Sequence, residues 1–483
     1  MKFTGRTFEL DYLDRLYQEP NGSLCVVYGR RRVGKTRLLT QWLEQNNYPG
    51  FYWLATDSSS TALLRSLSHM VYYQLHGTLP EQAAFSYYDW DALFQELARL
   101  IQENGQKYVI ILDEFSYAIG AYPDLTHKLQ AIWDHQFKDL PVMLVLSGSH
   151  IGMMEEGILA HRSPLYGRAT GRLKLDQFPY RDVRNSFPGY DVESCVALYS
   201  VLGGVPYYLE QIDPTLSITE NVIQRVMGSP ALVQDEPRLL LYDHFTQPRL
   251  YSALIAQVAA GNHSPKDISR VTDMEPATVS SYLSTLVRLG LLEREVSATE
   301  RHPERSRRSR YRVTDPYLRF YHRFLLPQLP FLARGAYQAV WKTIELHWRA
   351  FIGTHTFEEL CREWVYVAAE IGELPFLPQV VGSHWSKSEQ IDVVAINWDE
   401  GQVLYGECKW KCDSAFNLTE VEKLLQRSTQ IALETGSGHP FEAHYIFFSR
   451  SGFTKPARDR AHEIDATLVD LDILDSVMAQ AIR

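Results

Sequence analysis

Residues 29–36 read Gly-Arg-Arg-Arg-Val-Gly-Lys-Thr, which is a complete G-x-x-x-x-G-K-[ST] phosphate-binding loop. The apolar run at residues 24–28 favours a β-strand, and residues 37–43 carry apolar side chains at helical spacing. Such a loop works between a strand and a helix, because amides at the helix start donate hydrogen bonds to bound phosphates. The alternative is a glycine-rich turn that ends in Lys-Thr by chance, and the flanking patterns argue against it.

The residue types inside the loop predict how it holds ATP and Mg2+. Gly29 and Gly34 allow the backbone to curl around phosphates. Lys35 is expected to reach the β- and γ-phosphates, and the Thr36 hydroxyl is expected to ligate Mg2+. The other loop residues are also expected to contact the nucleotide, namely Arg30, Arg31, Arg32 and Val33.

Two further strand patterns end in polar residues suited to phosphate chemistry. Residues 108–112 are apolar and lead into Asp113 and Glu114. We expect Asp113 to hold Mg2+ through water and Glu114 to polarise the attacking water. Residues 142–146 lead into Ser147, which we expect to sense the γ-phosphate or to orient that water.

The pattern around these motifs indicates the fold class. Strand patterns at residues 51–54 and 172–175 alternate with helical stretches such as residues 90–103 and 125–137. This alternation predicts an α/β domain with a mainly parallel sheet that helices cover on both faces. An extra strand between the phosphate-loop strand and the Asp113 strand is typical of ATPases that carry a catalytic glutamate.

Length and composition set the broad class of the protein. A chain of 483 residues is too long for one core and predicts two to four domains, while 45% hydrophobic and 22% charged residues fit a globular protein. A net charge of -10 argues against coating by nucleic acid but not against a local basic patch. The five scattered cysteines argue against a disulfide framework, and Cys408 and Cys412 lack the second ligand pair of a zinc site. Because no apolar run approaches about 20 residues, we expect no membrane span and a cytoplasmic location.

About the first 230 residues resemble the archaeal-type ATPase family, in the AAA+/STAND branch of P-loop NTPases. The resemblance rests on the phosphate loop, the Leu-Asp-Glu-Phe strand end, Phe3-Thr4-Gly5-Arg6 and residues 163–168. Residues 203–209 resemble the lid motif of that branch, which contacts the nucleotide base.

The same resemblance implies further site residues. Arg6 and Pro206, in the matching N-terminal box and lid motif, are expected near the nucleotide. An arginine after the third strand is expected to act on the γ-phosphate, from the same chain or from a neighbouring copy, so a homo-oligomer is a candidate assembly. Arg168 matches this position best and Arg162 is the second choice. The alternative is that either arginine simply pairs with a surface acid.

Residues 251–313 show the order of elements of a winged helix-turn-helix, whose third helix can enter a DNA major groove. Helical patterns at residues 251–259, 265–270 and 275–290, the last with a glycine stop, precede strand-like stretches at residues 291–296 and 311–313.

The stretch that would form the wing, residues 301–312, carries six arginines against one acid, Glu304. The arginines are Arg301, Arg305, Arg307, Arg308, Arg310 and Arg312. This charge predicts contact with DNA phosphates. Packing is the alternative role, because the predicted recognition helix offers hydroxyl groups but only Arg288 as a cation.

After a helical, aromatic-rich connector, the C-terminal part of the chain carries a second set of polar residues. Glu358 lies in a helix expected to begin near Ala350, and Asp392 lies in a strand pattern. Glu407 and Lys409 end a further strand and project from one face of it, and a hairpin can bring Asp392 beside Glu407. The two carboxylates can then share Mg2+ or Mn2+, while Lys409 orients or deprotonates the attacking water.

This set resembles the PD-(D/E)xK nuclease superfamily, in the form fused to archaeal-type ATPases. Asp392, Glu407 and Lys409 match its core, and Glu358 matches its helical acid. Ile391 stands where the superfamily has proline, a position that carries no chemistry. The resemblance implies a restriction-endonuclease-like α/β fold that cleaves DNA. The alternative is an inactive nuclease-like fold that serves as an interaction platform.

These patterns combine into one hypothesis about the chain. We expect a P-loop ATPase domain at residues 1–175, a helical lid at 176–250, a winged helix-turn-helix at 251–318, a helical connector at 319–348 and a nuclease-like domain at 349–483. The leading hypothesis is an ATP-hydrolysing, DNA-associated protein whose nucleotide state gates the C-terminal domain. The alternative is a regulatory or scaffold switch, in signalling or transcription, that binds ATP and cleaves nothing.

Overall fold

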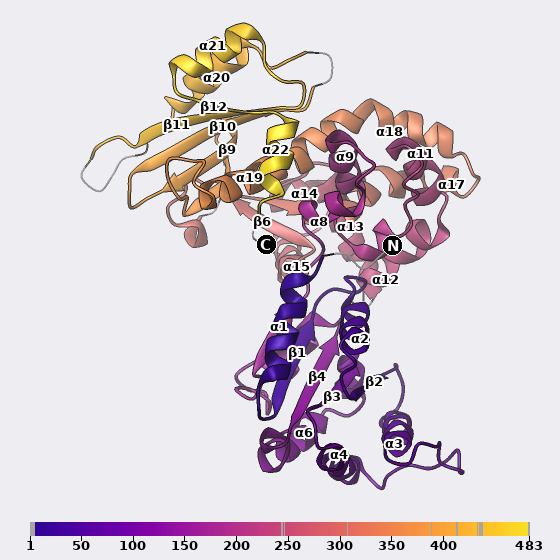
Figure 1. Ribbon diagram of the computed structural model, residues 1–483. Coiled ribbons are helices and arrows are strands. Elements are labelled where there is room, and N and C mark those ends of the chain that lie inside the picture. The colour runs from indigo at the N-terminus through magenta and orange to yellow at the C-terminus, as the bar shows by residue number, and fades with distance from the viewer. Residues whose placement is uncertain are drawn as a thin grey trace. The chain divides into compact units, whose positions relative to one another are not determined.

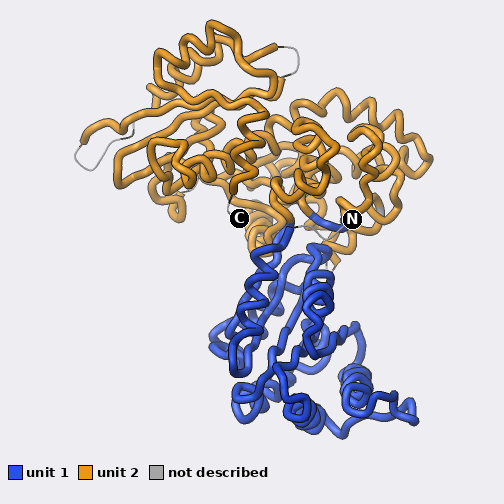
Figure 2. Tube along the Cα trace, viewed as in Figure 1, with its two compact units in different colours: residues 1–177, 205–207 blue, residues 178–204, 208–483 orange. Residues whose placement is uncertain are grey.

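The computed structural model describes residues 5–242, 245, 247–306, 308–387, 389–411, 414–431, 433 and 438–481. Phe3, Thr4, Arg307 and Cys412, which entered the sequence predictions, lie outside these residues. The chain forms two compact units (Figure 2). The first unit contains residues 1–177 and 205–207, and the second contains residues 178–204 and 208–483.

The first unit is built around a five-stranded sheet in the order β2-β3-β4-β1-β5 (Figure 1). Its strands are β1 (Ser23–Tyr28), β2 (Gly50–Leu54), β3 (Tyr108–Asp113), β4 (Val142–Gly148) and β5 (Gly171–Lys174). Every neighbouring pair runs parallel. The predicted parallel α/β sheet is therefore confirmed, and β4 is the strand that separates β1 from β3.

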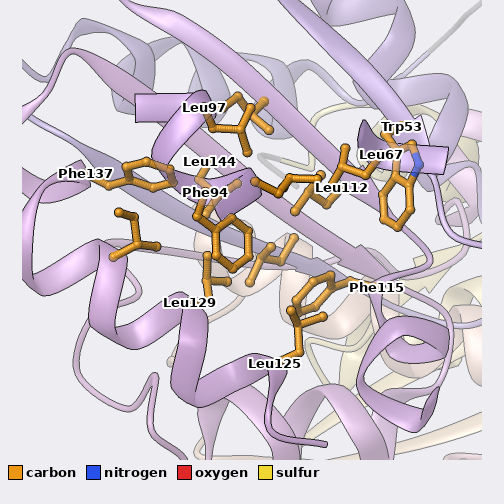
Figure 3. Packing of buried hydrophobic residues seen from close by; sticks show 14 of the residues in the cluster. Trp53, Leu67, Phe94, Leu97, Leu112, Phe115, Leu125, Leu129, Phe137 and Leu144 are labelled. Carbon is orange, nitrogen blue, oxygen red and sulfur yellow. The ribbon is translucent and has the colours of Figure 1, made fainter. Parts of the chain in front are cut away.

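Helices cover both faces of this sheet. The helices are α1 (Thr7–Gln18), α2 (Lys35–Gln45), α3 (Ser60–His76), α4 (Trp90–Asn104), α5 (Phe115–Ala121), α6 (Leu125–His135) and α7 (Ile151–Met154). α1 and α2 share one core cluster with the strands, centred on residues such as Trp42. α3 to α7 share the other, where Phe94 and Leu129 cluster with strand residue Leu144 (Figure 3). Because side chains alternate along each strand, the sheet is buried on both sides.

The second unit begins with helices and continues into a winged helix-turn-helix. The first helices are α8 (Tyr180–Ser186), α9 (Val192–Leu202), α11 (Ile218–Asn221) and α12 (Glu236–Tyr242), while α10 (Pro206–Leu209) begins in the stretch 205–207 of the first unit. The helix-turn-helix consists of α13 (Pro248–Ala259), α14 (Pro265–Thr272) and α15 (Pro276–Arg288). Strands β6 (Leu292–Val296) and β7 (Ser309–Val313) then pair antiparallel as a wing. The order of elements predicted for this region is confirmed.

A helical connector leads into the C-terminal sheet. It contains α16 (Pro316–Phe320), α17 (Leu329–Leu332), α18 (Tyr337–Phe351), a π-helical segment (Ile352–Phe357) and α19 (Glu358–Glu370). The expectation that the helix carrying Glu358 begins near Ala350 is wrong, because Ala350 lies inside α18. No proline interrupts residues 337–370, so the backbone stays helical through the π-helical segment to Glu358.

The C-terminal sheet has five strands in the order β12-β11-β10-β9-β8 (Figure 1). Its strands are β8 (Val380–Trp385), β9 (Gln390–Asn397), β10 (Gln402–Lys409), β11 (Glu442–Ser449) and β12 (Thr467–Val469). Its remaining helices are α20 (Leu418–Ser428), α21 (Lys455–Glu463) and α22 (Leu471–Met478). β8, β9 and β10 form an antiparallel meander, whereas β11 and β12 join β10 in parallel.

The sequence predicts neither a membrane span nor a disulfide framework. Within the described ranges, no helix is both long enough and apolar enough to cross a membrane. The four described cysteines, Cys25, Cys195, Cys361 and Cys408, are all buried and free.

Candidate functional site

The phosphate loop joins the end of β1 to the start of α2. A Cβ atom on Gly29 would lie 2.2 Å from the carbonyl oxygen of Leu175, so only glycine fits the close approach of loop and strand end. Gly34, at φ +93°, adopts a backbone conformation that residues with a side chain rarely reach. The two glycines therefore allow the curled path that a phosphate cradle needs.

Lys35 is held inside this curl. Its Nζ donates to the carbonyl oxygens of Gly29, at 2.9 Å, and Arg30, at 3.1 Å. Burial lowers the pKa of Lys35, while the nearby carboxylates of Glu114 and Asp113 act in the opposite direction. The amine thus lies inside the loop, where it can reach a bound phosphate.

Thr36 and Asp113 meet at the carboxyl edge of the sheet. The Thr36 hydroxyl donates to Oδ2 of Asp113 at 2.6 Å, and the Tyr52 hydroxyl donates to the same oxygen at 2.9 Å. A hydroxyl and a carboxylate side by side are oxygen ligands of the kind that Mg2+ prefers beside nucleotide phosphates. These residues therefore fit the magnesium ion that the phosphate loop implies. Tyr52 was not predicted, because an alternating strand pattern does not say which side chain reaches the site.

Glu114 follows β3 directly and adopts a left-handed backbone conformation, with φ 49°. One oxygen of its carboxylate accepts hydrogen bonds from the Ser149 amide, at 3.1 Å, and from the Ser149 hydroxyl, at 2.5 Å. Ser147, the residue predicted to act beside Glu114, is fully buried, and its hydroxyl has no hydrogen-bond partner among the described residues. The side chain at the end of β4 that reaches Glu114 is thus Ser149, two residues further along the chain.

Arg6 and Pro206, implied by family resemblance, both lie at the phosphate loop. The buried Arg6 guanidinium donates to the carbonyl oxygen of Val33 at 3.0 Å and pairs with Glu9 at 2.8 Å. Pro206 belongs to the short stretch 205–207 that joins the first unit, and its ring lies 3.8 Å from a Cβ built on Gly34. Arg6 therefore contacts the loop at Val33, and Pro206 lies beside Gly34.

Tyr207, which was not predicted, also lies at the loop. The Arg32 guanidinium lies 3.8 Å from the centre of the Tyr207 ring, a cation–π contact between two residues of the first unit. Arg32 itself has a left-handed backbone, with φ 71°. Pro206 and Tyr207, both in the first unit, therefore lie beside the loop.

Arg168 lies at the other edge of the sheet. Thr170, two residues on, hydrogen-bonds the amide of Leu24 near the start of β1, whereas the phosphate loop follows the end of that strand. The Arg168 guanidinium forms a two-fold ion pair with Asp134, at 2.7 and 2.6 Å, and these hydrogen bonds lower the pKa of Asp134. Arg162 forms an exposed pair with Glu156 at 3.2 Å. The chain's own γ-phosphate would thus lie a strand length away from Arg168, roughly 20 Å for the six residues of β1.

Comparison with known proteins agrees with this geometry. Residues 3–212 match a family described as an ATPase domain predominantly from Archaea. This stretch is an archaeal-type ATPase domain. Residues 254–296 match the IclR helix-turn-helix domain, and residues 321–423 match a family described as archaeal and bacterial proteins of unknown function.

Individual relatives extend the comparison. The chain is 28% identical over 430 residues to an uncharacterized protein of Methanocaldococcus jannaschii, covering 89% of this chain and 92% of the relative. It is 48% identical over 42 residues to an uncharacterized ATP-binding protein of the same organism, covering 9% of this chain and 71% of the relative. The Walker-type ATPase of Pyrococcus abyssi shares the fold, with a TM-score of 0.50 and 18% identity over 66% of this chain and 96% of that one. The protein is thus a P-loop ATPase that also carries a helix-turn-helix.

The wing of the helix-turn-helix packs against the C-terminal sheet. The Ala298 amide donates to the carbonyl oxygen of Ser383 in β8 at 2.9 Å. The Arg310 guanidinium lies 4.6 Å from the centre of the Trp385 ring, and that of Arg301 lies 5.6 Å from the Trp398 ring.

A third wing arginine forms ion pairs within the protein. Arg312 pairs with Glu293 at 2.7 Å, with Glu295 at 3.0 Å and with Glu359 on α19. Arg305 and Arg308 are exposed, and Arg307 lies outside the described residues. Arg301, Arg310 and Arg312 therefore contact side chains outside the wing, and the packing role left open by the sequence applies to them.

The polar residues predicted in the C-terminal domain come together on β9, β10 and α19. The antiparallel register pairs Gly406 with Val393, which sets Glu407 opposite Asp392. The Cys408 amide donates to Oδ2 of Asp392 at 3.1 Å, and Lys409 forms an ion pair with Glu407. Burial raises the pKa of Glu407, and the Asp392 carboxylate adds to this rise.

Glu358 adds a third carboxylate from the first turn of α19. Burial raises its pKa well above the ordinary glutamate value, and Asp392 contributes to the same rise. Two arginines that were not predicted border the cluster: Arg362 lies 3.7 Å from Glu358, and Arg427 lies 3.4 Å from Glu407. Across the described part of the chain, no group of three or more histidine, cysteine, aspartate or glutamate side chains has the arrangement that would hold a metal ion.

Proposed function

We propose that this ATPase acts on DNA and that its nucleotide state controls a metal-dependent nuclease-like site in the C-terminal domain. The observation that carries the proposal is the register of β9 and β10, which sets Asp392 opposite Glu407 with Lys409 on the same face. Glu358 from α19 completes the arrangement of the PD-(D/E)xK nucleases that the sequence resembles.

In the proposed hydrolysis cycle, residues of the phosphate loop and of the neighbouring strand ends have separate roles. Lys35 and the loop amides bind the β- and γ-phosphates, while Thr36 and Asp113 hold Mg2+. Mg2+, when bound, neutralises charge that develops on the phosphate oxygens. Glu114 accepts a proton from the attacking water, and the two hydrogen bonds from Ser149 fix the direction of its carboxylate.

We assign Arg168 to the γ-phosphate only of a neighbouring copy. Its distance from the loop of its own chain and its pairing with Asp134 support this restriction. The assembly that follows is a homo-oligomer in which the arginine edge of one ATPase domain faces the phosphate loop of the next.

The C-terminal residues suit phosphodiester hydrolysis. The raised pKa values of Glu358 and Glu407 reflect carboxylates crowded in a partly buried place, where a divalent cation would offset their repulsion. Asp392 and Glu407 would hold Mg2+ or Mn2+, and the metal would supply charge stabilisation at the scissile phosphate. Lys409 would orient the attacking water and stabilise the developing negative charge.

DNA would be held by the helix-turn-helix beside this domain. α15 exposes Thr278 and Ser281, and the wing tip exposes Arg305 and Arg308. Hydroxyl groups on the helix and cations at the tip fit contact with phosphates and base edges.

The test is cleavage of supercoiled and linear DNA in Mg2+ or Mn2+, with and without ATP. Asp392→Asn should abolish cleavage, because the amide cannot hold a divalent cation as a carboxylate does. Asp399→Asn is the matched control, an exposed aspartate in the same β-hairpin whose replacement should leave cleavage intact. Equal cleavage by wild type and Asp392→Asn would refute the nuclease assignment.

A second candidate function, an ATP-dependent switch that cleaves nothing, is favoured by one specific observation. Glu407 is already paired with Lys409 and with Arg427, so its charge is balanced within the protein. In this function the C-terminal domain would contact a partner, and the helix-turn-helix would respond to nucleotide. Intact ATP hydrolysis without cleavage, together with ATP-dependent gel retardation of labelled DNA, would favour the switch.

A further inference from the structure

Tyr52 is the tyrosine of β2 whose hydroxyl donates to the Asp113 carboxylate. β2 is the edge strand beside β3, and the parallel register places Tyr52 opposite Ile111 and Leu54 opposite Asp113. The neighbours of Tyr52 on the strand, Phe51 and Trp53, belong to the core on the other face. Strand alternation therefore turns the Tyr52 side chain to the face that α2 covers, where Asp113 also lies.

Three donors from three segments converge on Asp113, which is fully buried. Oδ2 accepts from the Thr36 hydroxyl at 2.6 Å and from the Tyr52 hydroxyl at 2.9 Å. Oδ1 accepts from the amide of Glu114 at 2.9 Å. Hydrogen bonds to an ionised acceptor are among the strong ones, so the carboxylate is held in one orientation.

The Tyr52 hydroxyl differs from the Thr36 hydroxyl in having no other task at the site. Thr36 is itself a ligand for Mg2+ in the ATPase mechanism. If Thr36 ligates Mg2+, the Tyr52 hydroxyl and the Glu114 amide remain as donors to Asp113, and Tyr52 is the side chain among them.

We propose that Tyr52 is a positioning residue of the ATPase that orients Asp113 toward the nucleotide-bound Mg2+. It acts through Asp113 alone and touches neither the nucleotide nor the attacking water. The proposal concerns the ATPase domain only, so its outcome is independent of any cleavage by the C-terminal domain.

The test is binding of a fluorescent ATP analogue to full-length Tyr52→Phe, first in EDTA and then along a Mg2+ titration. Phenylalanine keeps the ring packing and removes only the hydroxyl. In EDTA, the Kd for the ATP analogue should be the same for Tyr52→Phe and wild type. The Mg2+ concentration that gives half of the Mg2+-dependent gain in affinity should rise about threefold to tenfold in Tyr52→Phe, because one hydrogen bond is lost. The Mg2+ dependence of ATP hydrolysis should shift by the same factor at saturating ATP.

Tyr48→Phe is the matched control. Its hydroxyl donates to Asp14 at 3.2 Å, also an aspartate of the first unit, but it lies beyond the far end of α2 from the phosphate loop. Its Mg2+ titration should match wild type. An unchanged Mg2+ midpoint in Tyr52→Phe would overturn the proposal, as would equal weakening of binding in EDTA and in Mg2+, since either result assigns Tyr52 to packing.

Discussion

The Ser149 hydroxyl lies 2.5 Å from the Glu114 carboxylate, and the Ser149 amide donates to the same oxygen. The two residues follow the ends of β4 and β3, which are neighbours in the sheet. Because one carboxylate oxygen accepts both hydrogen bonds, the other oxygen can accept a proton from water. The glutamate that we propose as the acceptor of the water proton is thereby oriented by a serine.

The first prediction concerns this pair. Ser149→Ala should lower kcat for ATP hydrolysis about threefold to tenfold, with little change in the Kd for ATP, because it removes one hydrogen bond that orients Glu114. Phosphate release and binding of a fluorescent ATP analogue measure the two quantities. Ser147→Ala is the matched control and should leave kcat unchanged. A larger loss in Ser147→Ala than in Ser149→Ala would return the role to Ser147.

The second prediction concerns the wing. Arg305→Gln with Arg308→Gln should lower the slope of log Kd for DNA against log salt by about two, because each lost phosphate contact releases about one counterion fewer. The measurement is gel retardation over a range of salt concentrations. Arg334→Gln with Arg349→Gln, two exposed arginines of the connector, is the control. Identical slopes in all three proteins would leave the wing with a packing role only.

The third prediction concerns Arg168. If it acts on a neighbouring copy, Arg168→Ala and Lys35→Ala should each be inactive alone but recover ATP hydrolysis when mixed. In a mixed assembly, the Lys35→Ala copy supplies its intact arginine to the intact loop of the other copy. Hydrolysis is measured as a function of the mixing ratio. Arg168→Ala that retains wild-type activity would reduce the Asp134 pair to a structural contact, worth about 1 kcal/mol or less.

The fourth prediction follows from the raised pKa of Glu358. A carboxyl with a higher pKa in the folded chain binds protons more tightly there than in the unfolded chain. The free energy of unfolding therefore falls as pH rises from the ordinary glutamate pKa to the raised pKa, and it stays lower at higher pH. Glu358→Gln should raise the thermal unfolding midpoint at neutral pH and flatten its fall between pH 5 and 8.

Glu370→Gln is the control for this measurement, since Glu370 is an exposed acid on the same helix. Its unfolding midpoint should follow the wild-type pH profile. Parallel profiles for Glu358→Gln and wild type would show that the Glu358 carboxyl is not destabilised in the folded chain.

The ATPase fold could be predicted from the sequence because its strands are short apolar runs that end in motif residues. β1, β3 and β4 each bury nearly every side chain, as strands covered on both faces do, and each leads into the loop, Asp113 or Ser147. The helix-turn-helix could be predicted for a similar reason, because its first helix is amphipathic and proline starts the second and third helices.

The contacts made by particular side chains could not be predicted in the same way. Tyr52 and Ser149 reach the site through strand order, which no local pattern specifies, and the lid motif did not say that Tyr207 contacts Arg32. β8 was missed because its residues are mostly half exposed, and it is buried in part by the wing that packs on it. The wing arginines formed a clear charge pattern. Their contacts could not be predicted, because the tryptophans that Arg301 and Arg310 contact lie about 75 residues or more further along the chain.

The central claim is that nucleotide state controls the C-terminal site, and one comparison tests it most directly. Glu114→Gln should bind ATP without hydrolysing it, whereas Lys35→Ala should not hold ATP in a productive way. Cleavage of supercoiled DNA in Mg2+ and ATP would be measured for both variants beside Asp392→Asn. If nucleotide state controls the C-terminal site, Glu114→Gln and Lys35→Ala should cleave at different rates, and Asp392→Asn should not cleave. Equal rates in the two ATPase variants, both above that of Asp392→Asn, would contradict control by nucleotide.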